Sequence, residues 1–297
     1  MRATSSNDGR RARGRTSARF GRVPNARRLA WLVLAGVFCA PVAPAAAAPG
    51  KPAPSKARSQ ASLEEVAVML SSNDEDEVRT ALETAATLPA GDVLPMLEER
   101  VRSGLSRVLL DVAIDSLMLL DSKSEAPLLS DLARHRRPEV RVRALEVLGR
   151  LKAVPSAERV LTDALGDQAP EVRSAAASAL AELGSRSSLP ALERALDRGV
   201  DGAARALGRL AKPDDLGRLL ERVGRTPTTL LTPMFAALLA RKDVPDPDKL
   251  RSIEKLAGLG GEEASNALSE LHAQLPSEAS PRVRKALDEA AQKGKSE

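Results

Sequence analysis

From Ser62 onward, apolar residues recur with the spacing of an amphipathic helix, and no stretch alternates between apolar and polar positions with a period of two. The clearest segments are 138–151 and 170–183, each beginning with Pro-Glu-Val-Arg. Their apolar positions i, i+4, i+7, i+8 and i+11 are Val140, Ala144, Val147, Leu148 and Leu151, and Val172, Ala176, Ala179, Leu180 and Leu183. This spacing predicts two helices with one apolar face each. Proline suits the first turn because its missing N–H would have no partner there.

The same apolar spacing returns at an almost constant interval along the chain. Its first positions, which we call anchors, are residues 78, 109, 140, 172, 199, 230 and 264, separated by 31, 31, 32, 27, 31 and 34 residues. A second, shorter helix is predicted between successive anchored helices, at 92–103, 124–135, 156–166, 188–197, 213–224 and 246–258. Helical hairpins of this size bury their apolar faces by stacking on neighbours. The pattern predicts an all-α protein, an α-solenoid of about seven hairpins over residues 62–293.

The C-terminal end leaves the pairing of helices open. Residues 281–293 also follow the anchored pattern, but their anchor lies only 19 residues after the one at 264. Either this segment caps the array, or the pairing of helices shifts its register near residue 225.

Two segments carry a resemblance to a known family. Residues 165–184 place Asp before a turn, Pro-Glu-Val-Arg at the start of a helix and Ala and Leu at its core spacing, and residues 135–151 do nearly the same. This pattern resembles a HEAT repeat of the phycobilisome-lyase-like type, most strongly over 124–198, less over 62–121 and least over 199–293. The resemblance implies a curved right-handed superhelix with a concave binding surface. Most proteins of this kind are scaffolds or adaptors, and a minority are enzymes.

The residues offer little support for an enzyme. One branch of the enzymes built on this repeat binds iron through His-Glu pairs in several repeats. This chain has only His135 and His272, and neither is followed by Glu. Ser252 and Lys255 match a Ser-x-x-Lys pattern without its accompanying motifs. Phe235 is the only aromatic residue after position 47, too little to hold a tetrapyrrole. We therefore expect no catalytic residue, metal or cofactor, and keep a HEAT-like lyase or hydroxylase as the alternative.

The first 47 residues have the layout of a secretory signal peptide with a long basic n-region. Arg27 and Arg28 precede an apolar run at 29–40, and two prolines and an alanine run follow. The apolar run is shorter than the roughly 20 residues that span a bilayer. We expect cleavage after Ala46 or Ala47 and export to the periplasm or the cell exterior, without stable membrane insertion afterwards. An uncleaved leader that tethers a structural protein to the membrane is the alternative, and the export route stays open.

Short polar segments flank the predicted solenoid. Residues 48–61 are rich in Pro, Ser and Lys and are predicted to be a linker, and residues 294–297 form a polar tail.

The net charge of +5 arises in the leader. Residues 1–47 contain nine arginines and one acid, Asp8, so the remainder has 45 − 9 = 36 Lys and Arg against 40 − 1 = 39 Asp and Glu, a net charge of −3. A mildly acidic repeat region does not favour nucleic acid. We therefore expect a protein or peptide partner and no nucleic acid.

The predicted contact surface lies on the inner helices 138–151, 170–183 and 200–211. Its candidate residues are Arg141, Arg143, Glu146, Arg150, Arg173 and Arg205. Arg79, Arg141 and Arg173 each follow an anchor, and two interpretations apply to them. Either each bonds a turn acid or carbonyl of an adjacent repeat and together they form a ladder, which we favour, or they form a cationic stripe facing an acidic partner. Asp167 is the candidate partner of Arg173, and Arg143 is the arginine expected to be exposed.

Overall fold

The computed structural model describes residues 56–293, which consist of helices joined by short turns. Within this part of the chain there are fifteen α-helices and two short 3-10 helices, and no strand beyond one isolated bridge. The helices are α1 (Lys56–Leu70), α2 (Glu75–Ala85), α3 (Ala90–Ser103), α4 (Arg107–Leu120), η1 (Lys123–Glu125), α5 (Ala126–Leu132), α6 (Pro138–Arg150), α7 (Pro155–Ala164), α8 (Pro170–Leu183), η2 (Arg186–Ser188), α9 (Leu189–Asp197), α10 (Ala203–Leu210), α11 (Pro213–Leu220), α12 (Thr228–Ala240), α13 (Asp246–Ala257), α14 (Gly261–Gln274) and α15 (Pro281–Lys293). The predicted signal peptide at 1–47 and tail at 294–297 lie outside the described residues.

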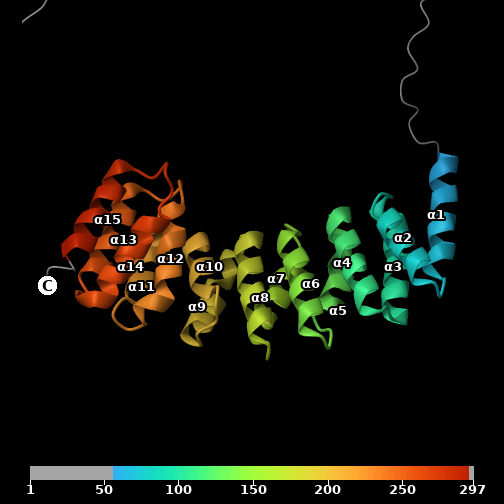
Figure 1. The fold of residues 1–297 in the computed structure, drawn as a ribbon, viewed down its shortest axis with the longest axis horizontal. Helices are drawn as coiled ribbons and strands as arrows, with labels where there is room; N and C mark the ends of the chain where they lie inside the picture. Colours follow the sequence, from blue (N-terminus) through green and yellow to red (C-terminus); the bar gives the residue numbers. More distant parts are fainter. Residues whose placement is uncertain (1–55, 294–297) are drawn as a thin grey trace, which may run out of the picture. The chain divides into compact units, whose positions relative to one another are not determined.

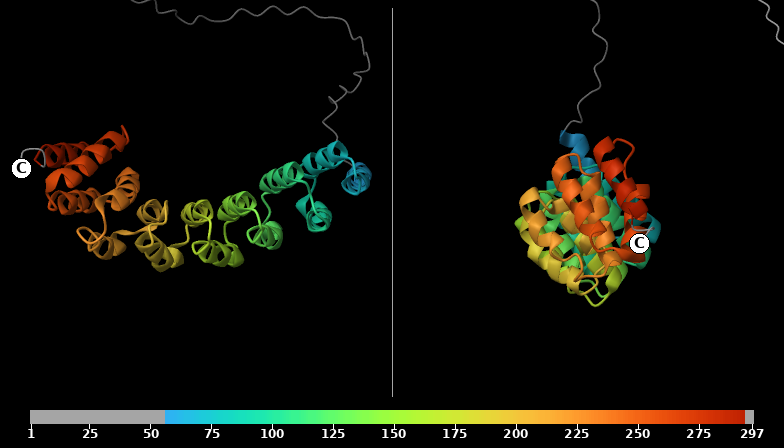
Figure 2. Two further views of the ribbon diagram at one scale, coloured as in Figure 1. Left: turned by 60° about the horizontal axis from the view of Figure 1, so that its bottom comes forward. Right: turned by 90° about the vertical axis from the view of Figure 1, so that its left-hand side faces the viewer.

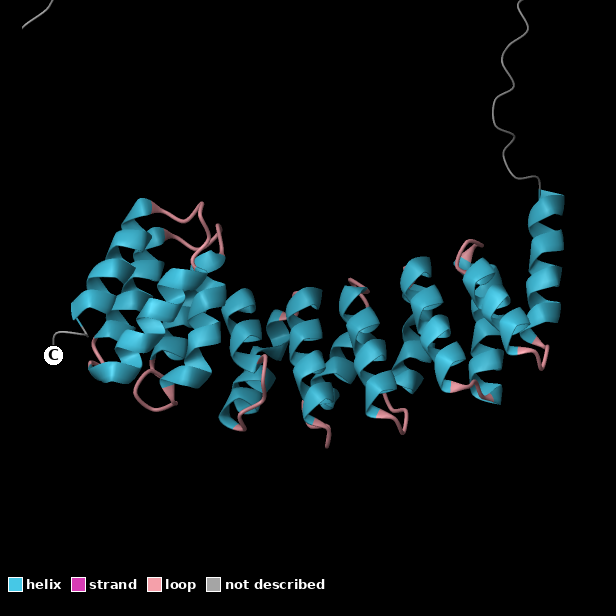
Figure 3. Ribbon diagram, in the orientation of Figure 1, coloured by secondary structure: helices cyan, strands magenta, loops and turns pink. Residues whose placement is uncertain are grey.

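The helices of residues 56–293 form two rows (Figures 1 and 3). Each even-numbered helix from α2 to α14 packs against the next even-numbered helix. Odd-numbered helices pack against these and, at several steps, against one another, as α1 does with α3, α5 with α7 and α13 with α15. The even-numbered helices are the seven anchored helices that the periodicity predicts. The predicted all-α solenoid is therefore confirmed.

The rows of residues 56–293 follow an arc, as the left view of Figure 2 shows. Between α4 and α10 the even-numbered helices lie on the inner side of this arc and the odd-numbered helices on the outer side. The helices expected to carry the contact surface are thus the inner ones.

The ends of the array settle one open alternative and correct one boundary. Helix α15 packs against α13 and α14, and the alternation of rows continues up to it. It therefore caps the array, and no shift of pairing occurs near residue 225. At the other end α1 begins at Lys56, so the last six residues of the predicted linker at 48–61 are helical.

One anchored helix is shorter than predicted. The fifth anchor, Gly199, lies in a turn with a φ of 69°, and Gly202 follows with a φ of 84°. Helix α10 therefore begins at Ala203, not at residue 200. Glycine adopts this left-handed backbone without steric cost, so two glycines extend the turn at the expense of the helix.

A continuous apolar seam of Leu, Ala and Val side chains fills the space between the rows. Phe235 in α12 is buried and is the one aromatic side chain among the described residues. Small side chains let the helices approach closely. This is clearest at two glycines, each nine positions after its anchor: Gly149 in α6 and Gly208 in α10.

These glycines mark the closest contacts between neighbouring inner helices. A Cβ atom at Gly149 would lie 2.8 Å from both Cα and Cβ of Ala179 in α8. At Gly208 it would overlap the carbonyl oxygen of Met234 in α12 and lie 2.9 Å from Cβ of Ala237. Real Cβ contacts are not this short, so a side chain at either position would push two helices apart.

Polar contacts follow the same repeat. Among the described residues, the hydrogen bonds that involve a side chain join positions either at most eight residues apart or 25 to 36 residues apart. Separations of 25 to 36 are those of neighbouring repeats. Each repeat therefore bonds to the next, as expected for a quasi-one-dimensional array.

Candidate protein-binding surface

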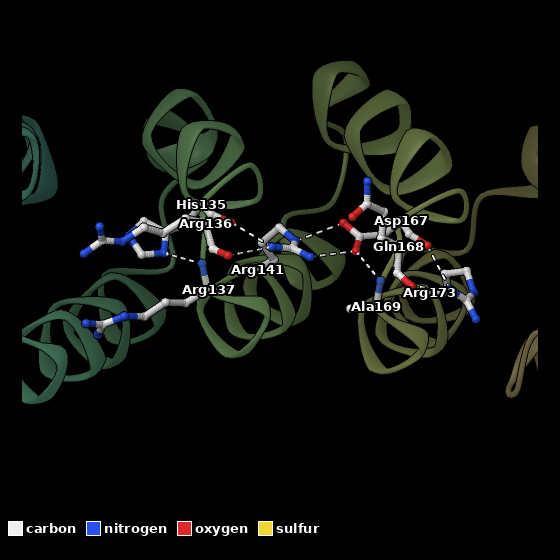
Figure 4. A network of polar contacts seen from close by, with 8 residues as sticks. All are labelled: His135, Arg136, Arg137, Arg141, Asp167, Gln168, Ala169 and Arg173. Carbon is white, nitrogen blue, oxygen red and sulfur yellow. Dashed lines mark hydrogen bonds and ion pairs between the residues drawn. The ribbon is translucent and has the colours of Figure 1, made fainter.

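Arg141 joins two neighbouring repeats at the edge of the array (Figure 4). Its Nε donates to Oδ2 of Asp167 at 2.9 Å and its Nη2 donates to Oδ1 at 2.7 Å, which is a bidentate pair. Its Nη1 donates to the carbonyl oxygens of His135 at 2.9 Å and Arg136 at 3.3 Å. Only 14% of the Arg141 side chain and 17% of the Asp167 side chain are exposed. Arg141 therefore fastens its own turn to the turn of the following repeat.

The charge of this pair perturbs the Asp167 carboxyl. Burial alone would raise the pKa of Asp167, but the hydrogen bond from Arg141, the backbone N–H of Ala169 and the charges of Arg141 and Arg173 outweigh it. The pKa of Asp167 is therefore lowered, and the carboxylate is held in its charged form.

Arg173 has the same position after its anchor as Arg141, but its contacts differ. Its Nη1 donates to the backbone carbonyls of Asp167 and Gln168, both at 2.9 Å. Asp167 is thus the partner of Arg173, as predicted. The bond goes to the backbone carbonyl of Asp167 and not to its carboxylate. Arg79 forms a long ion pair of 3.8 Å with Asp76 in its own helix. Of the three arginines, only Arg141 forms the predicted bond to an adjacent repeat, because Arg173 and Arg79 bond within their own turn or helix. The ladder is therefore present at one of the three positions.

Arg143, the arginine expected to make an exposed contact, is only partly exposed and is paired within the chain. Its guanidinium pairs with Asp115 of α4 and lies 3.7 Å from a carboxylate oxygen of Asp111, one turn earlier in that helix. One third of the side chain, 33%, is exposed. Arg143 therefore bridges α6 to α4, 28 residues earlier in the chain.

Arg150 and Glu146 lie further along the same face of α6, and both are exposed. Arg150 Nη1 lies 3.0 Å from the sulfur of Met118, and its Nε lies 3.7 Å from a carboxylate oxygen of Glu182 in α8. Glu146 has no hydrogen bond or ion pair with any residue that the structure describes. Of the residues that the sequence predicts on α6, Glu146 is the one left free for a partner.

The register of the anchored helices defines two lines of side chains along the inner face. From the anchor at 109 onward, the first line lies six positions after each anchor and comprises Asp115, Glu146, Ser178, Arg205, Ala236 and Glu270. The second lies ten positions after each of these anchors and comprises Leu119, Arg150, Glu182, Arg209, Ala240 and Gln274. Every member of both lines is at least partly exposed. Along these lines the inner face is acidic or mixed in charge from α4 to α8, basic at α10, apolar at α12 and acidic again at α14.

A cavity of about 400 Å³ lies among α10, α12 and α14 on these lines. Its lining consists of Arg205, Arg209, Pro233, Ala236, Ala237, Ala240, Arg241, Glu270 and Gln274. Sequence reasoning identified Arg205 and missed the rest. The register of the repeats could have identified Arg209, because Arg209 and Arg150 each lie ten positions after an anchor.

The residues considered for catalysis make contacts within the chain. The hydroxyl of Ser252 is buried and donates to the carbonyl of Asp248 at 2.8 Å. Nε2 of His272 lies 2.9 Å from a carboxylate oxygen of Asp288 in α15. Burial and three neighbouring arginines lower the pKa of His135. No group of three His, Cys, Asp or Glu side chains in residues 56–293 is placed to hold a metal ion, and no helix there is long and apolar enough to cross a membrane.

Stacked helical hairpins that bond only to adjacent hairpins define the class of α-solenoid repeat proteins. Residues 125–202 match the HEAT repeat family. The matched residues are nearly the same as 124–198, where the sequence pattern is strongest. Residues 125–202 are therefore HEAT repeats, within an all-α solenoid that continues on both sides of them. None of the curated proteins matches its sequence.

Several solved structures resemble this chain, and three of them illustrate the level of similarity. The complex of CpcE and CpcF of phycocyanin lyase from Nostoc sp. PCC7120 is 18% identical, covers 86% of this chain and 99% of its own, and has a TM-score of 0.42. An engineered protein is 18% identical over 79% of this chain and 68% of its own, with a TM-score of 0.35. A Kap121p mutant is 13% identical over 79% of this chain and 32% of its own, with a TM-score of 0.28. Similarities of this level indicate nothing about what this chain binds.

Proposed function

We propose that this protein is a non-catalytic, exported scaffold that binds a protein partner along the inner face of its solenoid. The proposal rests on one observation: inner-face side chains differ in charge and size from helix to helix, while the helices that carry them are bonded to one another. A surface of this kind distinguishes one extended partner from another.

The bonds between repeats favour binding because they hold the surface in place before the partner arrives. Arg141 with Asp167 and Arg143 with Asp115 link consecutive inner helices or their turns. Ser116 adds a link by donating to the carbonyl of Leu82 at 2.8 Å. A preorganised surface loses less conformational entropy on binding, so more of the contact energy appears as affinity.

The location outside the cytoplasm is supported by the sequence of residues 1–47, whose basic segment, apolar run and alanine-rich site have the order of a signal peptide. The intact mass of the protein recovered from the exporting cell tests this part. A mass that begins near residue 47 is expected, and a mass that retains the apolar run would contradict cleavage.

The binding role is tested by capture of the partner with the full chain from the cell envelope. Glu146→Lys reverses a free charge on the inner face and should weaken capture at least several-fold, with the far-ultraviolet circular dichroism unchanged. Glu99→Lys in α3 is the matched control, because Glu99 is an exposed acid of the other row. Equal capture by both variants would argue against an inner-face partner, and bound iron or a visible chromophore would favour the lyase or hydroxylase alternative.

A further inference from the structure

The cavity among α10, α12 and α14 exists because small residues interrupt the two inner-face lines. Ala236 and Ala240 in α12 occupy positions where neighbouring α10 has Arg205 and Arg209 and neighbouring α14 has Glu270 and Gln274. Two side chains are therefore missing from a surface that is filled at the helices on either side. The resulting volume of about 400 Å³ lies in the range of small-ligand sites, roughly 300–1,000 Å³.

The floor of this cavity is apolar. Pro233, Ala236, Ala237 and Ala240 line it from α12, and none of these side chains carries a polar atom. Burying an apolar group against such a floor is favourable because it removes apolar surface from water. The floor therefore suits one apolar side chain of a partner.

One wall of the cavity carries two unpaired cations. Arg205 and Arg209 are one turn apart on α10, and neither guanidinium has a hydrogen bond or ion pair with any residue in the described part of the chain. Other inner-face arginines do have acidic neighbours: Arg143 pairs with Asp115, and Arg150 lies near Glu182. Like charges one turn apart on a helix repel, so a carboxylate placed between Arg205 and Arg209 removes this repulsion and gains charge-assisted hydrogen bonds.

The remaining charged groups of the cavity are already engaged. Arg241 donates to the carbonyl of Gly208 at 3.0 Å and to Asp243 at 3.0 and 2.6 Å, so it ties the end of α10 to the end of α12. On the α14 wall, Nε2 of Gln274 donates to Oε1 of Glu270 at 2.8 Å. The free positive charge is thus confined to the α10 wall.

We propose that this cavity binds an extended segment of a partner protein in which an apolar side chain lies beside a carboxylate. The inference rests on the scaffold function and specifies its partner. The apolar side chain fills the space left by Ala236 and Ala240, and the carboxylate pairs with Arg205 and Arg209. The chain's own residues 1–47, with nine arginines against one acid, have the wrong charge for this site. A polyanion such as single-stranded nucleic acid is disfavoured, because the apolar floor offers its phosphates no partner.

The test measures fluorescence anisotropy of labelled peptides with the purified full chain. The probe is a short extended peptide with a central Leu-Glu pair between Pro and Gly residues. Matched peptides carry Leu-Lys or Ser-Glu in its place. The Leu-Glu peptide should bind at least about tenfold more tightly than either, because Leu-Lys loses the hydrogen bonds of the carboxylate and Ser-Glu loses the apolar contact with the floor. Equal binding of all three would overturn the proposal.

Variants locate the binding. Arg205→Ala combined with Arg209→Ala should weaken binding of the Leu-Glu peptide at least about tenfold, as should Ala240→Trp, which fills the floor. Ala240 is exposed, so the larger side chain does not enter the core. Arg194→Ala is the control, because Arg194 is an exposed arginine of α9 in the outer row. Peptide binding that survives in the double variant would contradict the site.

Other occupants give different results. Tighter binding of a labelled oligothymidylate, lost in the double variant, would assign the site to nucleic acid and overturn the proposal. Dimerisation in light scattering that the double variant abolishes would assign it to a second copy and overturn it too. If the double variant keeps its native partner while Glu146→Lys loses it, the scaffold function stands and this inference fails.

Discussion

At the residue scale, one arginine position serves different purposes in different repeats. Arg141 and Arg173 both follow an anchor and both donate to carbonyls of the turn five and six residues earlier. Arg141 also reaches the carboxylate of Asp167, 26 residues ahead. The corresponding place for Arg173 is Gly199, which has no side chain to accept a bond. A repeated motif therefore conserves the bond within a turn, while the bond between repeats depends on the neighbour.

The Arg141–Asp167 pair should contribute measurably to stability. Arg141→Lys retains the charge but loses the bidentate geometry, so we expect the free energy of unfolding to fall by about 2 kcal/mol. Urea denaturation measures this change. The matched control is Arg79→Lys at the same position after another anchor, whose partner Asp76 is 91% exposed, and it should change stability by less than about 0.5 kcal/mol. Similar losses in both variants would contradict a special role for this pair.

A buried carboxyl should make stability depend on pH. Glu125 is fully buried; its Oε1 accepts from the N–H of Ser122 at 2.8 Å, and its Oε2 has no partner among the described residues. Burial raises the pKa of Glu125 to about 7 from 4.5, the charge of Asp121 adds to the rise, and the Ser122 hydrogen bond opposes it. Because the folded state holds this proton more tightly, the contribution of Glu125 is fully present below pH 4.5 and is lost as pH rises through 7.

Glu125→Gln removes this titration. The variant should be more stable than the parent at pH 8, by at most about 3 kcal/mol, and its advantage should shrink toward pH 5. Urea denaturation at several pH values measures the slope. Glu139→Gln, at an exposed position of α6, is the control and should leave the slope unchanged. A parent whose stability rises between pH 5 and pH 8 relative to Glu125→Gln would contradict the assignment.

At the element scale, the close approach of neighbouring inner helices depends on glycine, whose side chain is a single hydrogen atom. Gly→Ala in a helix normally stabilises by roughly 1 kcal/mol. At Gly149 and Gly208 the added methyl group meets backbone atoms of α8 and α12, and such overpacking typically costs about 1–3 kcal/mol. The packing cost exceeds the gain in helix propensity, so both substitutions should destabilise the protein, Gly208→Ala more severely.

Gly217→Ala in α11 is the matched control for these two variants. A Cβ at Gly217 meets nothing within 4 Å, so only the helix propensity changes and stability should rise by about 0.5–1 kcal/mol. Thermal unfolding followed by circular dichroism gives all three values. Stabilisation by Gly149→Ala would show that α6 and α8 do not approach as closely as described.

The helices could be predicted because the spacing of apolar residues that defines them is local. The candidate binding site could not, because it depends on contacts between helices. Val140, Ala144 and Leu148 define a buried face by spacing alone, and all three are buried. The partners of Arg143 lie 28 and 32 residues earlier, at Asp115 and Asp111, so they depend on how two helices pack. The cavity likewise depends on the contrast between small residues of α12 and larger residues of its neighbours. Aligning positions six and ten after each anchor would have revealed that contrast.

At the scale of the whole molecule, the described part of the chain behaves as a series of adjacent contacts. Side-chain hydrogen bonds extend no further than 36 residues, and each inner helix packs against the inner helices before and after it. The stability of such an array is approximately a sum of repeat and interface contributions. Loss of a core side chain should therefore weaken its own repeat and the repeats on either side, while distant repeats retain their structure.

Leu180→Ala in α8 tests this consequence by amide hydrogen exchange. Leu180 is completely buried, and such truncations cost about 2–5 kcal/mol. Since each 1.4 kcal/mol is a factor of ten, exchange should accelerate at least about tenfold in α6, α8 and α10. Exchange in α14 and α15 should stay unchanged. Leu268→Ala in α14 is the reciprocal control and should give the opposite distribution. If either variant instead accelerates exchange equally from α2 to α15, the array unfolds as one cooperative unit, and a partner bound at one repeat would then stabilise every other repeat.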